Sequence, residues 1–172
     1  VAPTKIGLTE TFISAHIDRL PHEIVHIHGY RMDYIWEGRK LREWPREVRG
    51  EKNSRWLYML PRFLEFRIRR RLYQPATDLY IVRDFLRIQK IDIVLAEYGT
   101  AAAFITPVCQ SAEIPLVAHF HGFDASRFRT LEQFSDIYKA MFDYASSVIS
   151  VSHAMSHALV ALGCPEDKIC CN

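Results

Sequence analysis

Residues 91–122, IDIVLAEYGTAAAFITPVCQSAEIPLVAHFHG, hold two apolar runs on either side of a stretch of small and apolar residues. The runs 91–97 and 114–120 are apolar at nearly every position, a pattern typical of strands that are covered on both faces. Residues 100–112 between them predict a helix. Buried strands joined by a helix favour a parallel sheet, so we expect a doubly wound α/β domain with a mostly parallel, Rossmann-like sheet.

The same alternation of strands and helices continues on both sides of this stretch. The other predicted elements are helices at 10–20, 54–73, 76–90, 130–145 and 153–163, and strands at 23–29, 146–152 and 168–171. Thr130 and Gln133 form a capping-box pattern at the start of one of these helices. Residues 31–54 are charged and contain Pro45 and Gly50, which predicts an irregular segment.

The composition is that of an ordinary globular domain, with 172 residues of which 49% are hydrophobic and 24% charged. No apolar run approaches the roughly 20 residues that cross a bilayer, and no signal peptide is visible. The four cysteines form no Cys-x-x-Cys pair, which favours reduced thiols. These features predict a cytoplasmic protein and argue against a membrane-spanning or disulfide-rich one.

Polar residues follow the predicted strands at their carboxyl ends, where doubly wound sheets bind ligands. They are His28-Gly29-Tyr30, Glu97-Tyr98-Gly99, the run from His119 to Asp124, and Ser152-His153. Thr9, Thr100 and Ser152 stand where helices begin, and free N–H groups at a helix start suit phosphate or sugar oxygens. The sequence therefore predicts one ligand cleft along this edge of the sheet.

Two His-x-His pairs, His26/His28 and His119/His121, each precede a glycine. Residues i and i+2 of a strand point the same way, so His119, His121 and Asp124 could bind a metal, and a metal-dependent hydrolase is one alternative function. The competing interpretation is a partly buried histidine that hydrogen-bonds the backbone, which suits His26, His28 and His119. We expect His121, just beyond the strand, to reach a ligand, where a neutral imidazole can accept a hydroxyl hydrogen bond or act as a general base.

Three stretches, in this order, resemble the N-terminal half of a GT-B glycosyltransferase of family four. They are GLTETFISAHIDRL (7–20), DIVLAEYGTAAA (92–103) and PLVAHFHGFDAS (115–126), the last followed by YASSVISVSHAMSHALVALGCPEDKI (144–169). Each motif is short, but their series and spacing are fairly specific. The resemblance covers most of residues 5–170, without the segment 31–75.

This resemblance implies an acceptor-binding domain of an enzyme that transfers a sugar, with retention, from a nucleotide-sugar to an acceptor hydroxyl. It also implies a hexosyltransferase of polysaccharide or glycolipid biosynthesis that needs no metal or other cofactor. By the same resemblance His121 is the catalytic candidate that contacts the reacting sugar or acceptor. The residues implied to line the cleft are Gly7, Thr9, Glu10, Thr11, Glu97, Tyr98, Gly99, Thr100, His119, Gly122, Asp124 and Ser152.

Relatives of this kind also carry a full first strand and a second domain that binds the nucleotide-sugar. We therefore expect residues 1–172 to be a single Rossmann-like domain from a longer enzyme and to be inactive alone. A non-catalytic binding module is the remaining alternative function.

The segment 39–71 is strongly basic, with twelve Lys and Arg against four Asp and Glu, whereas the rest of the chain is −6 (10 basic minus 16 acidic). Within it, RFLEFRIRRRLYQ (62–74) interleaves arginines with apolar residues. One interpretation is a surface helix with a solvated basic face. The other is an interfacial helix that holds anionic lipid at the inner face of a membrane. The acidic remainder argues against a nucleic-acid partner.

Overall fold

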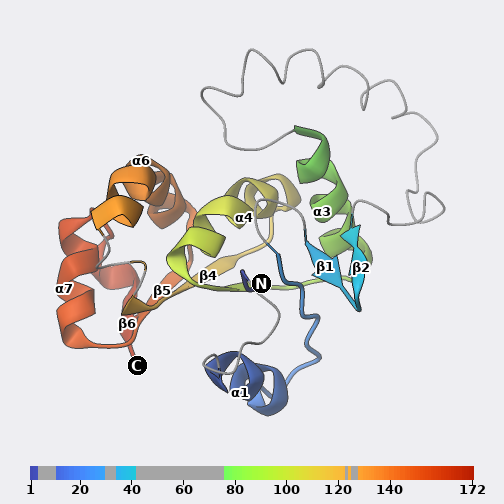
Figure 1. Ribbon diagram of the computed structural model, residues 1–172, viewed down its shortest axis with the longest axis horizontal. Helices are drawn as coiled ribbons and strands as arrows, with labels where there is room; N and C mark the ends of the chain where they lie inside the picture. Colours follow the sequence, from blue (N-terminus) through green and yellow to red (C-terminus); the bar gives the residue numbers. More distant parts are fainter. Residues whose placement is uncertain (4–10, 30–33, 42–75, 123, 125–127) are drawn as a thin grey trace.

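The computed structural model describes residues 1–3, 11–29, 34–41, 76–122, 124 and 128–172 (Figure 1). Its main sheet has four strands in the order β3 (Val94–Glu97), β4 (Leu116–Phe120), β5 (Ser147–Ser150) and β6 (Ile169–Cys171). All neighbouring pairs in this sheet are parallel. The predicted doubly wound α/β class is therefore confirmed.

Extended segments continue the sheet beyond β3. The amino group of Val1 donates to the carbonyl of Leu95, and the amide of Glu97 donates to the carbonyl of Val1. Ala2 and His28 form a parallel bridge on the other side. The predicted strand at 23–29 is thus reduced to bridges at His28, because in the described ranges this residue alone bridges to other segments, to Ala2 in parallel and to Ile35 in antiparallel orientation.

The helices connect the strands as the apolar pattern predicts. They are α1 (Thr11–Arg19), α3 (Ala76–Ile88), α4 (Gly99–Ala112), α6 (Phe128–Tyr144) and α7 (His153–Ala161), with a short 3-10 helix at Glu166–Lys168. Because α6 begins at Phe128, Thr130 lies inside its first turn, so the predicted capping box is wrong. The helix predicted at 54–73 lies outside the described residues.

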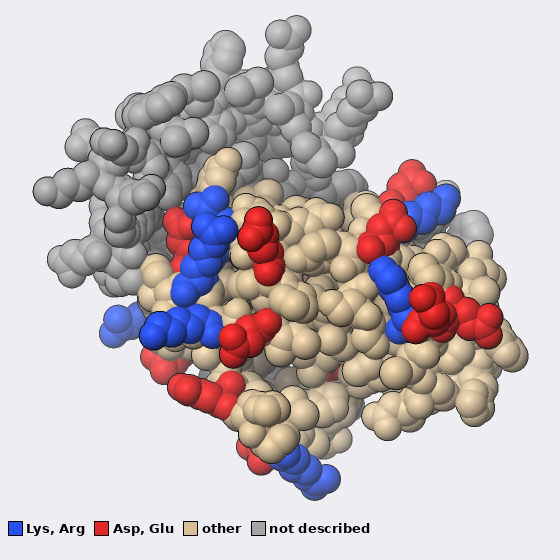
Figure 2. Space-filling view, turned by 180° about the vertical axis from the view of Figure 1, so that it is seen from behind, with Lys and Arg blue, Asp and Glu red and all other residues tan. Residues whose placement is uncertain are grey.

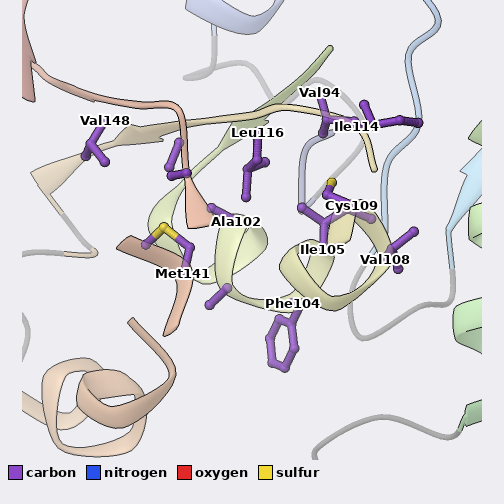
Figure 3. Close-up of a cluster of buried hydrophobic side chains, with 14 of the residues drawn as sticks. Val94, Ala102, Phe104, Ile105, Val108, Cys109, Ile114, Leu116, Met141 and Val148 are labelled. Atoms are coloured by element: carbon purple, nitrogen blue, oxygen red, sulfur yellow. The ribbon is translucent and has the colours of Figure 1, made fainter. Parts of the chain in front are cut away.

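Helix α4 is buried along most of its length because it packs between the sheet and the helices α3 and α6. In Figure 3, Ala102, Ile105 and Cys109 of this helix lie near Val94 and Leu116 of the strands. Small side chains on a helix let its backbone approach a sheet closely, which explains the alanine-rich start of α4.

Helix α1 lies on the opposite side of the sheet, below it in Figure 1. Between them lies an open cavity of about 750 Å³, lined by apolar residues that include Ile13, Ile17, Leu95, Val117 and Ile149. Strand side chains alternate between faces, so Leu95 and Val117 share this face with Glu97 and His119. The sheet edge predicted to bind ligands thus opens beside α1.

The predicted irregular segment 31–54 contains a small antiparallel ribbon of β1 (Ile35–Trp36) and β2 (Arg39–Lys40). Of the basic segment 39–71 the structure describes only 39–41, so the interfacial helix lies outside the described residues. On the face of the molecule shown in Figure 2, basic (blue) and acidic (red) side chains of the described residues lie close to one another. No helix within the described ranges has the length and apolar character required to cross a bilayer.

Candidate functional site

Glu97, the last residue of β3, lies at the centre of three histidines. Its Oε1 is 2.5 Å from Nδ1 of His16, and its Oε2 is 2.9 Å from Nδ1 of His119 and 3.2 Å from Nε2 of His121. The glutamate is almost fully buried, at 4% exposure. We call Glu97, His16, His119 and His121 the His–Glu cluster.

The sheet register and one helix bring the cluster together. Glu97 and His119 are partners across the parallel pair β3–β4, so their side chains share a face. His121 follows two residues later and contacts the same carboxylate oxygen as His119. His16 reaches them from α1, which covers this face. The His–Glu cluster therefore lies at the carboxyl ends of two adjacent strands, the edge at which the sequence predicts a ligand cleft.

Aromatic rings hold His121 in place. The ring of Phe12 stacks on it with a centroid distance of 4.2 Å, and the rings of Tyr98 and His119 lie at 4.7 and 4.3 Å. The side chain of His121 is 14% exposed to solvent. A ring packed in this way keeps one orientation while a small part of it stays accessible.

The hydrogen bonds of the cluster determine the charge of Glu97. Burial by itself would raise the pKa of this carboxyl group, because desolvation penalises the charged form. The bonds to His119, His121 and His16 outweigh burial and hold the pKa of Glu97 well below its usual range. Glu97 is therefore a carboxylate at neutral pH. Within the described ranges, Nε2 of His119 is buried and has no hydrogen-bond partner.

Asp124 is fully buried beside the cluster and binds backbone amides. One carboxylate oxygen accepts from the amide of Gly99 at 2.9 Å and from that of His121 at 3.3 Å. The other accepts from the amide and the hydroxyl of Thr100, both at 3.4 Å. Burial raises the pKa of Asp124 against these bonds. The carboxylate thus caps the start of α4 and orients the loop after β4.

The turn from β3 into α4 is tight. Tyr98 has φ 77° and ψ 136°, a backbone conformation that residues with a Cβ rarely adopt. The next residue, Gly99, packs against Phe120: a Cβ at Gly99 would lie 2.3 Å from its ring. Gly122, by contrast, has open space where a Cβ would stand and no positive φ, so its conformation does not require glycine.

The structure brings some of the predicted cleft residues together and separates others. Glu97, Tyr98, His119 and His121 meet directly, and Gly99, Thr100 and Asp124 form the adjoining turn. Ser152 follows β5 and caps α7, because its hydroxyl accepts from the amide of Met155 at 3.2 Å. Thr11 is exposed at the start of α1. Gly7, Thr9 and Glu10 lie outside the described residues.

The second histidine pair has a different environment. The rings of His26 and His28 stack at 5.6 Å, and His28 bridges Ala2 and Ile35. Burial, followed by the positive N-terminus and His28, lowers the pKa of His26 to about 4. This pair belongs to the edge of the sheet that Ala2 extends.

Sequence reasoning missed His16 and Phe12 as members of the site. They lie one turn apart on α1, at positions i and i+4, and both point toward the sheet edge. The signal was a histidine at helical spacing from apolar residues, but a helix alone does not indicate which strand its face meets.

His16, Glu97 and His119 have donor atoms within 4.8 Å of one another and are therefore the candidates for a metal site in the described part of the chain. Two ligands on tetrahedral zinc, with bonds of about 2.0–2.1 Å, stand roughly 3.4 Å apart. The two histidine nitrogens lie at 2.5 and 2.9 Å from the carboxylate, which is hydrogen-bond spacing. Asp124, the third ligand in the alternative metal site with His119 and His121, instead binds the backbone.

Two comparisons with known proteins found a match to this chain. The family model described as Glycosyltransferase Family 4 matches residues 28–171. Over 83 residues the chain is 32% identical to the amylovoran biosynthesis glycosyltransferase AmsK of Erwinia amylovora. This alignment covers 45% of the chain and 20% of that relative's length. No solved structure matches the chain.

Proposed function

This chain belongs to glycosyltransferase family 4, and from that premise we propose that it is the acceptor-binding domain of a retaining hexosyltransferase. The enzyme would move a sugar from a nucleotide-sugar to an acceptor hydroxyl in polysaccharide or glycolipid biosynthesis. The observation that carries the proposal is the position of the His–Glu cluster at the carboxyl ends of β3 and β4, where doubly wound sheets bind ligands.

In this proposal His121 contacts the reacting sugar or the acceptor hydroxyl. Its ring is held by Phe12 and Tyr98 and keeps some exposure, so it can meet a ligand without a change of rotamer. Tyr98, Gly99 and Thr100 would form the adjoining wall. The nucleotide-sugar would bind mainly to a second domain of a longer protein. AmsK extends well beyond the aligned stretch, which supports that part of the proposal.

The direct test is sugar transfer by the full-length gene product, measured with a panel of nucleotide-sugars. We expect His121→Ala to lower kcat/KM by about 100-fold or more, the scale of a lost proton-transfer or charge-assisted contact. His157→Ala, an exposed histidine of α7, is the matched control and should leave the rate unchanged. A folded His121→Ala protein with transfer within threefold of wild type would remove His121 from the mechanism. Inversion at the anomeric carbon of the product would contradict the retaining reaction.

The proposed mechanism uses no resident metal. The metal-dependent hydrolase remains the second candidate, since these residues would supply donors suited to zinc. Metal analysis of the purified protein separates the two. Stoichiometric zinc or iron, lost in a His16→Ala variant, would favour the hydrolase, and metal-free protein that transfers sugar would exclude it.

We also propose that the cytoplasmic enzyme binds the inner face of a membrane through the basic segment 39–71, where a lipid-linked acceptor would lie. This segment holds twelve basic and four acidic residues, and its net positive charge supports this attachment. Sedimentation with vesicles tests it: binding should require anionic lipid and weaken with salt. Binding that is indifferent to lipid charge would contradict it.

A further inference from the structure

The hydrogen bonds of the His–Glu cluster determine which ring nitrogens carry protons. A carboxylate only accepts hydrogen bonds, and it offers about four lone-pair sites. The low pKa of Glu97 keeps it ionised, so every nitrogen that faces it must be an N–H donor. His16 and His119 therefore hold a proton on Nδ1, and His121 holds one on Nε2.

For His121 this leaves Nδ1 as the nitrogen with a free lone pair in the neutral ring. Within the described ranges, the hydrogen bond of this ring is the one from Nε2 to Glu97. A flip of the ring about its Cβ–Cγ bond would put carbon atoms where the nitrogens lie, but stacking on Phe12 at 4.2 Å and the contact with Tyr98 at 4.7 Å oppose it. The carboxylate of Glu97 thus selects the tautomer of His121, and the aromatic rings of Phe12 and Tyr98 fix the orientation of the His121 ring.

His119 cannot do the same work, because its second nitrogen is buried and has no described partner. A proton there would be a buried donor without an acceptor, which is costly. Its two neighbours on the carboxylate are more open, with side-chain exposures of 31% for His16 and 14% for His121. His119 therefore anchors Glu97, while His121 can meet a substrate.

We propose that Glu97 is a positioning residue: it accepts an N–H from three histidines at once and so presents the unprotonated Nδ1 of His121 to a substrate hydroxyl. This inference rests on the proposed function for the identity of the hydroxyl, but not for the tautomer. It changes the expected role of Glu97 from a residue that lines the cleft to one that acts through His121.

Two substitutions separate an acceptor role from a general structural one. Glu97→Leu is similar in size and removes both acceptor oxygens. Glu97→Gln keeps one acceptor oxygen, which satisfies His119 and His121 when it takes the place of Oε2. The amide NH₂ then faces His16, which must present a bare Nδ1. Glu113→Gln, at the exposed end of α4, is the matched control.

Nitrogen NMR of histidine-labelled protein reads the tautomers directly. We expect wild-type His121 with its proton on Nε2 and His119 with its proton on Nδ1. Glu97→Leu should release His121 into a mixture of tautomers, and Glu97→Gln should change His16 alone. A wild-type proton on Nδ1 of His121 would overturn the inference. So would a folded Glu97→Leu protein with unchanged His121 signals or, if that variant does not fold, a Glu97→Gln protein with unchanged His16 signals.

Kinetics of the full-length enzyme then distinguish the inference from the proposed function. Glu97→Leu should lower kcat by about 10- to 100-fold, the range for partners that orient a functional histidine, with little change in KM. Glu97→Gln should recover most of that loss. If the tautomers are as expected but sugar transfer needs neither Glu97 nor His121, the proposed function is refuted and the inference stands. The opposite tautomer of His121, together with an essential His121, would refute the inference alone.

Discussion

Replacement of Gly99 by alanine tests the closest contact in the site. The added Cβ would lie 2.3 Å from Cε1 and 2.4 Å from Cζ of Phe120, far inside van der Waals contact. Phe120 cannot move aside easily, because it is fully buried and packs against Tyr138 and Phe142 at centroid distances of 5.3 and 5.8 Å. Either the start of α4 or the Phe120 ring must shift.

We expect Gly99→Ala to lower the free energy of unfolding by about 1–3 kcal/mol, the usual cost of one extra carbon in a packed core. The helix propensity of alanine would offset this by at most about 1 kcal/mol. Because the carboxylate of Asp124 is bonded to the amide of Gly99, a shift of the helix would also stretch that 2.9 Å contact. Denaturant unfolding followed by circular dichroism measures the loss.

The matched control is Gly122→Ala, whose Cβ would meet nothing within 4 Å and which should stay within about 0.5 kcal/mol of wild type. A double-mutant cycle with Phe120→Leu gives the sharper result, since a smaller side chain relieves the clash. The coupling between the two sites should exceed about 1 kcal/mol, with Gly99→Ala less costly in the Phe120→Leu background. An unchanged Gly99→Ala protein, or additive effects, would refute the packing argument.

Three further predictions concern charge and capping. The folded-state pKa of Glu97 lies below its unfolded value of about 4.3, so its stabilisation is present above that pH and is lost as the pH falls. The free energy of unfolding, measured by urea titrations at several pH values below 5, should therefore decrease more steeply with falling pH in wild type than in Glu97→Gln. Equal pH slopes for the two proteins would contradict this. His26, with a pKa lowered to about 4, should make stability fall as the pH drops from about 6.5 to 4, because only the unfolded chain gains a proton there; His26→Asn should remove that slope, and an unaltered slope would count against it. Ser152→Ala removes the cap of α7 and should cost about 1 kcal/mol in unfolding experiments, whereas Ser152→Asp should keep the stability, and equal losses would show that the cap contributes nothing.

The local pattern of the sequence was sufficient for the fold class and for the edge of the sheet that carries the site. Strands covered on both faces are apolar at nearly every position, and this signature is visible at 91–97 and 114–120 without any partner. The same pattern places Glu97 and His119 near the ends of two successive strands. Local patterning was less reliable at helix starts, where Thr130 resembled a cap but the helix begins at Phe128.

Only the tertiary structure determined which side chains meet. His16 contacts Glu97 across 81 positions of sequence, and Asp124 caps a helix that begins 25 residues earlier. Gly99 is required by the ring of Phe120, which no neighbouring residue indicates. The physical reason is that periodicity reports how each segment meets solvent or core, whereas partners depend on sheet register and on where each helix packs. Both are fixed by long-range packing, so a single segment does not encode them.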